Sequence, residues 1–350
     1  MTTAHREGFC CGRRTAGLGL GGREPFAFPS TTRRYAPDRS ADIRHTLIEI
    51  ALDPAVVHIA GRVSHTVTAL HDDTATLSLH ADELTITGAE AADGTPLRFE
   101  HVGEDLEVHL PSPLKAGAEA TVRISYEGTP RRGIYFISPD SGYPDKPVQA
   151  WTQGQDEDSR FWFPCFDHPS EKMSTELRAR VPAKYTVVGN GALKGKETHD
   201  DGTVTWHWKQ AIPHSAYLVT LAVGEFEELV LEGGSVPLTA YVPHGTRALA
   251  ERAFGRTAAM ITCFEEHYGV RYPYEKYAQV VVEDFIFGGM ENTSATTLID
   301  LVLYDDRAAL DFDMDDLVAH ELAHQWWGDL LTCRDWSHAW LNEGFATWSE

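Results

Sequence analysis

The sequence predicts a multidomain chain of the β plus α/β class, in which an N-terminal all-β sandwich or curved sheet precedes an α+β domain. Its 350 residues exceed what one ordinary core accommodates. From Asp42 to about Gly233, short apolar and β-branched segments are separated by turn clusters such as Asp93-Gly94. Past Gly233-Gly234, strand and helix patterns alternate, which indicates a second domain.

The first 34 residues differ from the rest of the chain. They hold six arginines, two acidic residues and a glycine-rich stretch at Gly17–Gly22. The Arg13-Arg14 pair suggests an export signal or a transit peptide, but Ala16–Gly22 is too short and glycine-rich for a signal core. We therefore divide the chain into a disordered or non-domain tail (1–34), a β domain (35–235) and an α+β domain (236–350).

The β domain is predicted from seven segments, which are Ile43–Leu52, Ala75–Thr87, Leu106–Leu110, Thr121–Tyr126, Glu176–Val188, Val204–Trp208 and Tyr217–Gly224. Trp151–Lys172 does not resemble a strand, because polar amides and acids stand beside a run of aromatic residues. Within it, Gln153 and Gln155 fit either a solvated loop or a binding site.

In the second domain, Val236–Val242 is predicted to be a strand and Leu249–Tyr268 a helix that stops at Gly269. Strands are expected at Tyr277–Glu283 and Leu298–Leu303. A further helix is expected to begin near residues 313–316, where aspartates complement the positive end of the helix dipole.

The overall charge excludes some classes of partner. Thirty Lys and Arg against 52 Asp and Glu give a net charge of −22, which argues against nucleic acid and anionic membranes. No apolar run is long enough to span a bilayer. Five cysteines without paired zinc-type spacing favour a reducing compartment, so we expect a cytoplasmic protein.

The most informative stretch is His320-Glu321-Leu322-Ala323-His324. Histidines four residues apart project from one face of a helix, so both rings can bind one ion. Glu343, nineteen positions past His324, can supply a third ligand from a second helix. Two histidines and one glutamate leave a fourth position open, which is typical of a catalytic zinc site. Glu321 can then serve as the general base. The alternative is an amphipathic helix whose histidines only pack.

Two residues near Glu343 are candidates for orienting the ligands. A metal-bound histidine usually donates its other N–H to a fixed acceptor, and Asn342 or Glu350 can accept it. Glu350 lies two helical turns beyond Glu343, near the same face. A solvated residue is the equally weighted alternative for Glu350.

A second motif is Gly288-Gly289-Met290-Glu291-Asn292, which follows an apolar strand. Two glycines allow another backbone to approach, as strand addition by a peptide substrate requires. Glu291 would place a carboxylate beside that substrate. Taken alone, the pentapeptide also fits an ordinary turn.

Together these motifs resemble the aminopeptidase N family of zinc metallopeptidases, family M1, which includes relatives of leukotriene A4 hydrolase. The resemblance implies a thermolysin-like α+β domain, of which this chain holds the first part, and one Zn²⁺ per chain. It implies that His320, His324 and Glu343 are the zinc ligands, Glu321 the general base and Glu291 the acid that binds a peptide's free N-terminal amine. The other substrate-binding residues that it implies are Gly288, Gly289, Met290, Asn292, Gln153, Gln155 and Phe287.

The sequence departs from this family in one respect. The family places a tyrosine that stabilises the oxyanion some sixty residues past the glutamate ligand, before a helical C-terminal domain, whereas this chain ends at Glu350. We therefore expect the 350-residue piece alone to be incomplete, poorly stable and nearly inactive. The alternatives to an aminopeptidase are an epoxide hydrolase of the leukotriene type and a non-catalytic homologue or fragment. The oligomeric state is not predicted.

Overall fold

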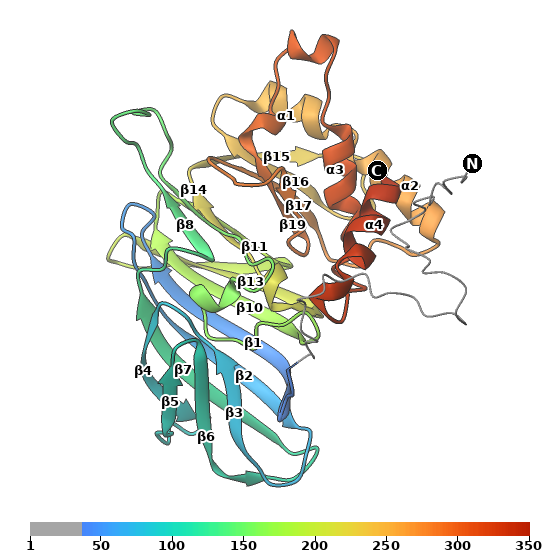
Figure 1. Cartoon of the computed structure of the whole chain (residues 1–350). Helices are drawn as coiled ribbons and strands as arrows, with labels where there is room; N and C mark the ends of the chain where they lie inside the picture. The colour runs from blue at the N-terminus through green and yellow to red at the C-terminus, as the bar shows by residue number, and fades with distance from the viewer. Residues whose placement is uncertain (1–36) are drawn as a thin grey trace, which may run out of the picture. The chain divides into compact units, whose positions relative to one another are not determined.

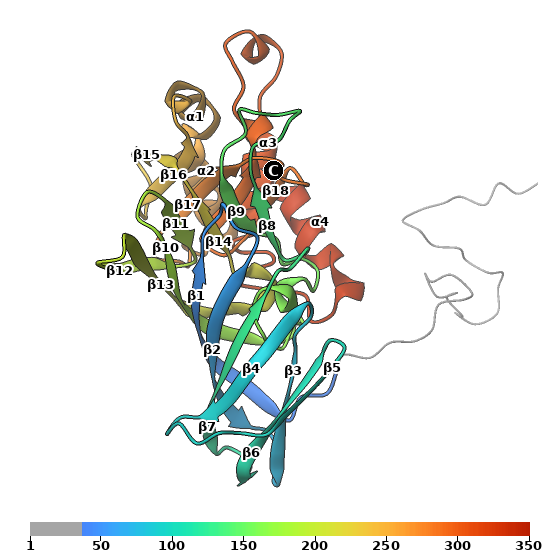
Figure 2. The same cartoon turned by 90° about the vertical axis from the view of Figure 1, so that its left-hand side faces the viewer.

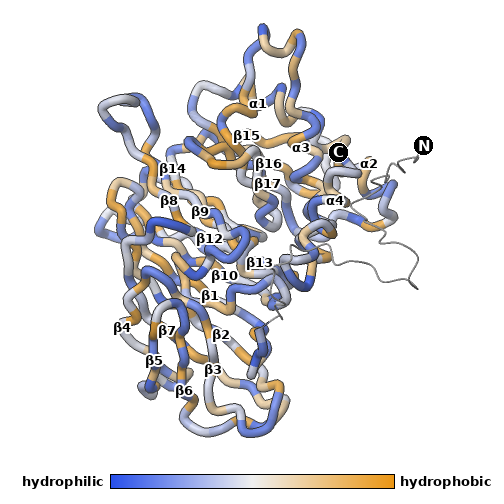
Figure 3. Tube along the Cα trace, in the orientation of Figure 1, coloured by the Kyte–Doolittle hydropathy of each residue, from blue (hydrophilic) through white to orange (hydrophobic). Residues whose placement is uncertain are grey.

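Alternating burial along long strands builds the largest sheet of the computed structural model, which describes residues 37–350. In β1, Ile48 and Ile50 point into the core while Glu49 between them is partly exposed. Figure 3 shows the same alternation of hydropathy along the strands of this sheet. The strand order is β12-β13-β10-β1-β2-β7-β4, and only the β1–β10 pair among these neighbours is parallel. The strands are β1 (Ala41–Leu52), β2 (Ile59–Ala69), β4 (Leu84–Ala91), β7 (Glu119–Gly128), β10 (Lys172–Pro182), β12 (Ala192–Thr198) and β13 (Thr203–Ser215).

Two smaller antiparallel sheets accompany it, with strand orders β3-β6-β5 and β11-β14-β9-β8. Residues from all three sheets, such as Val63, Leu106 and Val187, belong to one continuous apolar core. The predicted β-rich first half is therefore confirmed (Figures 1 and 2). The strands are β3 (Thr74–His80), β5 (Phe99–Val102), β6 (Asp105–Leu114), β8 (Ile134–Ile137), β9 (Gln149–Thr152), β11 (Thr186–Gly189) and β14 (Leu221–Gly224).

One buried histidine shows how this core satisfies its polar groups. The Nδ1 atom of His65 lies 2.9 Å from the Thr46 hydroxyl, and its Nε2 atom lies 2.9 Å from the Pro164 carbonyl oxygen. Because a carbonyl only accepts, Nε2 carries the hydrogen of the neutral ring. Burial lowers the pKa of His65 to about 4.

The second half contains a five-stranded mixed sheet in the order β15-β16-β17-β19-β18. β17 pairs in parallel with both of its neighbours, and all its residues are buried, as expected of a central parallel strand. The strand predicted over Leu298–Leu303 differs from the observed strand, which begins at Ala295 and ends at Ile299. The chain enters a 3₁₀ turn after Ile299. The strands are β15 (Phe226–Leu231), β16 (Leu238–Pro243), β17 (Tyr277–Val282), β18 (Gly289–Met290) and β19 (Ala295–Ile299).

Four α-helices belong to this half: α1 (Arg247–Phe254), α2 (Thr257–Tyr268), α3 (Asp315–Ala323) and α4 (Trp340–Ser349). The single helix predicted over Leu249–Tyr268 is wrong, because the chain breaks at Gly255, a poor helix former. The break lets Phe254 and Ile261 pack into different apolar clusters. The predicted stop at Gly269 is confirmed by its φ of +67°. The 3₁₀ segments are η1 (Ser159–Phe161), η2 (Ala216–Leu218), η3 (Asp300–Val302), η4 (Ala308–Leu310) and η5 (Trp336–His338).

The predicted tail over residues 1–34 lies outside the described residues. The boundary near residue 235 stays a prediction. β15 precedes it in the chain but pairs with β16 in the second sheet. Among the described residues, no helix has the length and apolar character that crossing a membrane requires.

Candidate metal centre

Helices α3 and α4 lie together (Figures 1 and 2). Three side chains from the two helices converge there. His320 belongs to the last turn of α3, His324 caps its C-terminal end, and Glu343 belongs to the first turn of α4. The two imidazole Nε2 atoms are 3.1 Å apart. Oε2 of Glu343 lies 3.5 Å from Nε2 of His320 and 3.4 Å from Nε2 of His324. These three residues, the metal triad, form the one cluster with metal-ligand spacing found within residues 37–350.

The geometry of the metal triad fits zinc. Zinc–ligand bonds of about 2.1 Å in a tetrahedral arrangement separate the ligand atoms by about 3.4 Å. The three separations of 3.1 to 3.5 Å match that value. Two neutral imidazoles and a carboxylate also suit a borderline-soft divalent ion.

The electrostatics of the centre favour positive charge between these side chains. Hydrogen bonding to the two imidazoles lowers the pKa of Glu343. Burial opposes charge on His324, but the neighbouring carboxylates, Glu291 first among them, raise its pKa overall to about 10. The carboxylates therefore create a negative potential at the imidazole nitrogens, which a divalent cation would neutralise.

The outer nitrogens of both imidazoles have acceptors. Nδ1 of His320 lies 2.7 Å from Oε2 of Glu350, and Nδ1 of His324 lies 2.8 Å from the carbonyl oxygen of Trp327. Both rings can therefore present an unprotonated Nε2 towards a metal. The Trp327 acceptor is backbone, so the sequence holds no signal for it.

Asn342 makes no hydrogen bond to the imidazole of His320 or His324 among the described residues. Its Oδ1 atom accepts a hydrogen bond of 3.0 Å from the Cys333 N–H, and its Nδ2 donates to the Tyr217 hydroxyl at 3.3 Å. Asn342 therefore anchors the start of α4 to the segment before it and to the β-rich half. Sequence reasoning missed Tyr217, which is more than a hundred residues away in the chain.

The glycine motif lies on the edge strand β18, beside β19. An edge strand offers free backbone groups to a peptide that adds as a further strand. Gly289 also has an intramolecular role, since a Cβ atom there would overlap the Glu321 carboxylate. A Cβ at Gly288 would lie 3.2 Å from a Leu317 methyl.

Three acidic residues near the metal triad are buried with carboxylate oxygens that have no hydrogen-bond partner among the described residues. These atoms are Oε1 of Glu291, Oε2 of Glu321 and both carboxylate oxygens of Asp329. Burial raises the pKa of all three carboxyl groups. Such oxygens are suited to receiving a proton or an ammonium group from a substrate.

The structure brings some of the remaining predicted residues close to this motif. Gln153 is buried, and its Nε2 atom lies 3.2 Å from the Met290 sulfur. Phe287 is 51% exposed and packs edge-on against Phe285. Gln155 is partly buried. Asn292 is buried and donates to the Thr297 hydroxyl, so it supports the turn after β18.

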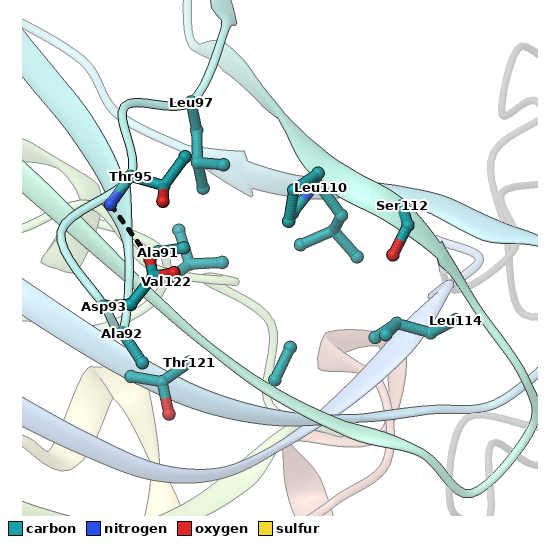
Figure 4. Close-up of a pocket in the computed structure, with 12 residues that line it drawn as sticks. Ala91, Ala92, Asp93, Thr95, Leu97, Leu110, Ser112, Leu114, Thr121 and Val122 are labelled. Carbon is teal, nitrogen blue, oxygen red and sulfur yellow. Dashed lines mark hydrogen bonds between the residues drawn. The ribbon is translucent and has the colours of Figure 1, made fainter.

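A separate pocket of about 340 Å³ opens between β4, β6 and β7 (Figure 4). Its lining is mainly aliphatic, including Leu97, Leu110 and Leu114. Its one acid, Asp93, accepts a hydrogen bond of 2.9 Å from the Thr95 N–H (Figure 4). Because its lining contains one acid and no histidine or cysteine, we place the chemistry at the metal triad.

Comparison with known proteins gives a consistent result. The Peptidase M1 N-terminal domain matches residues 40–218, and the Peptidase family M1 domain matches residues 252–350. Human endoplasmic reticulum aminopeptidase 1 is 30% identical over 294 residues, which cover 79% of this chain and 31% of the relative. Bovine aminopeptidase N is 31% identical over 347 residues, which cover 93% of this chain and 34% of the relative. The chain thus spans about a third of the length of these curated relatives.

Among solved structures, a mutant M1 zinc metallopeptidase from Deinococcus radiodurans, bound to a Tyr-Ser-Ala substrate, is similar with a TM-score of 0.73 and 26% identity. The match covers 89% of this chain and 70% of that one. A two-domain M1 zinc metallopeptidase mutant bound to L-tryptophan matches with the same TM-score.

Proposed function

This chain belongs to peptidase family M1, and we propose that it carries the metal centre of a zinc aminopeptidase that removes N-terminal residues from peptides. The observation that carries the proposal is the metal triad with ligand separations of 3.1 to 3.5 Å, beside two buried carboxylates. The names of its relatives support the same activity.

His320, His324 and Glu343 would hold the zinc ion. When bound, zinc supplies a Lewis acid that makes water a nucleophile near neutral pH. Glu321 would accept the proton of the attacking water and deliver it to the leaving amine. Its raised pKa suits both steps, because burial favours the protonated form that the second step needs.

Glu291 would bind the ammonium group of the substrate. It follows the edge strand β18 and is 3% exposed, so an ion pair with a substrate amine would be shielded from water. A fixed distance between this carboxylate and the metal triad would select the first peptide bond for cleavage. A substrate that extended N-terminally beyond the residue bound beside Glu291 would meet this carboxylate, which argues against an endopeptidase.

Of the alternative readings, a non-catalytic homologue is disfavoured because the three ligands and Glu321 are all present. No feature of the described residues favours an epoxide hydrolase over a peptidase. The proposal therefore stays with peptide substrates that have a free N-terminal amine.

The test compares Glu291→Ala with Glu321→Gln in the intact protein, using an aminoacyl amide and its N-acetyl derivative. We expect Glu321→Gln to abolish hydrolysis with zinc still bound. Glu291→Ala should reduce the preference for the free amine while some hydrolysis persists. The exposed Glu266→Ala on α2 serves as the matched control. If the wild-type protein hydrolysed the aminoacyl amide and its N-acetyl derivative equally well, the proposed aminopeptidase activity would be refuted.

A further inference from the structure

The segment after β18 is held by an unusual set of hydrogen bonds. It runs from Glu291 to Ser294, all four of its residues are buried, and Ser294 adopts a left-handed φ of +62°. The Ala295 N–H donates to the Asn292 carbonyl oxygen at 2.8 Å, which closes a β-turn directly after Glu291. The Glu291 carbonyl before this turn and the Ser294 N–H within it both bond to the side chain of Gln325.

Gln325 is fully buried directly after the ligand His324. Its Nε2 atom donates to the Glu291 carbonyl oxygen at 3.0 Å, and its Oε1 accepts from the Ser294 N–H at 2.7 Å. The Tyr272 hydroxyl donates a third hydrogen bond, of 3.2 Å, to the same oxygen. A carboxamide offers the same donor and acceptor as a peptide group, so one side chain joins the Glu291 carbonyl to the Ser294 N–H.

The far end of the turn is fixed by other contacts. Asn190 donates through Nδ2 to the Thr293 carbonyl oxygen at 2.8 Å, and the Gly191 N–H donates to the Ser294 hydroxyl at 2.7 Å. The ammonium group of Lys276 donates to the Ser294 carbonyl oxygen at 3.0 Å. With Thr293 and Ser294 held in this way, loss of the bonds to Gln325 would displace mainly Glu291, which precedes the turn.

We propose that Gln325 is a positioning residue that holds the Glu291 backbone beside this turn and thereby sets the distance between the Glu291 carboxylate and the metal triad. The inference rests on the proposed function, in which Glu291 binds the substrate amine. Because Gln325 adjoins His324 in the chain, one short segment carries a metal ligand and the support of the amine-binding residue. Gln325 itself touches no substrate and acts through the Glu291 backbone.

Loss of the Gln325 amide has a defined physical consequence. The Glu291 carbonyl and the Ser294 N–H would each be buried without a partner, and that costs free energy. The Glu291 carbonyl would then turn towards another donor, and this movement would carry the Glu291 carboxylate away from its present position. Misplacement of a positioning group by about 1 Å can reduce a rate by about 10²-fold.

The experiment uses the intact, zinc-loaded protein and three variants. Gln325→Met preserves the side-chain volume but removes both bonds to the turn. Gln325→Asn keeps the amide but is one methylene shorter, so it cannot reach both groups. Tyr272→Phe removes the third bond to Gln325 and the 3.0 Å bond of the same hydroxyl to the Lys276 carbonyl oxygen, but it keeps the bonds from Gln325 to Glu291 and Ser294, so it is the matched control. The measurements are kcat and KM for an aminoacyl amide and its N-acetyl derivative, the zinc content, and calorimetric binding of a free amino acid.

We expect Gln325→Met to raise KM for the free-amine substrate by about 10-fold or more, with a smaller change in kcat. The preference over the acetylated substrate and the affinity for the free amino acid should fall together, while zinc content stays at the wild-type level. Gln325→Asn should behave similarly, and it decides the matter if Gln325→Met does not fold. Tyr272→Phe should retain the wild-type preference.

Two results would overturn the inference. One is a folded, zinc-loaded Gln325 variant that keeps the wild-type preference and amino-acid affinity. The other is an equal loss of both in Tyr272→Phe. A wild-type protein without preference for free amines would instead refute the proposed function, so the two failures can be told apart.

Discussion

Replacing Glu350 by alanine should weaken zinc binding without removing a ligand. Its Oε2 atom lies 2.7 Å from Nδ1 of His320. The equivalent nitrogen of His324 bonds to the backbone of Trp327, which no side-chain substitution removes. Without Glu350, the His320 ring is free to rotate and to place its proton on the nitrogen that should face the metal.

The magnitude follows from the position of the carboxylate. Outer-shell acceptors of this kind change metal affinity by about 10- to 100-fold, or about 1.4 to 2.8 kcal/mol. The Glu350 side chain is 31% exposed, so solvent screens part of its charge. We therefore expect a loss near about 10-fold for Glu350→Ala. Glu350→Gln, which keeps an acceptor oxygen but no charge, should show about half of that loss in free energy.

The assay is competition with a chromophoric zinc chelator at fixed pH, using the intact protein. Glu266→Ala, an exposed substitution on α2, controls for the general effect of removing a negative charge. Glu343→Ala, which removes a ligand, gives the scale of a complete loss. If Glu350→Ala binds zinc as tightly as the wild type, its contact with His320 has no role in orienting the ligand.

Two further substitutions test the site and the core. Gly289→Ala should lower kcat by about 10²-fold with zinc retained, because the added Cβ displaces the Glu321 carboxylate. Gly288→Ala should lower kcat by a smaller factor. Equal kcat values for these two variants would refute the reasoning. The pKa of His65, lowered from 6.5 to about 4, gives stability that is present above pH 6.5 and lost as the pH falls through 4. The difference in unfolding free energy between wild type and His65→Gln, measured by denaturant titration, should shrink by about 3 kcal/mol between pH 7 and pH 4. A difference that does not change with pH would contradict this prediction.

The proximity of the His320 and His324 rings could be predicted from the sequence because it depends on local information. His320 and His324 are related by one helical turn, and that spacing alone brings their rings together. Glu350 could also be found, since it follows Glu343 by two turns on α4. The β-rich first half and the α+β second half can likewise be predicted from the spacing of the apolar residues. The break at Gly255 was not, because it depends on which cluster each helix packs against.

The residues that sequence reasoning missed act across long separations or through backbone atoms. The Trp327 carbonyl carries no side-chain signal, and the Tyr217 hydroxyl reaches Asn342 from another part of the chain. Gly289 was assigned to substrate approach alone, whereas the structure also requires it for the Glu321 carboxylate. Such roles depend on the packing of elements that no local pattern relates.

The long-range contacts explain why the β-rich half matters to the chemistry. Lys172, on β10, donates through Nζ to the carbonyl oxygens of Asp329 and Leu330, each at 2.9 Å. The Asn190 side chain likewise donates a hydrogen bond to a backbone carbonyl oxygen of the turn that follows Glu291. The first contact fixes the segment that follows His324, and the second fixes the turn beside it. A helix with two correctly spaced histidines can bind a metal by itself, but a constant distance from that metal to Glu291 requires both sides of the turn to be held. In the proposed function, the selection of the first peptide bond would therefore depend on the two halves together, although every residue that would touch zinc lies in one of them.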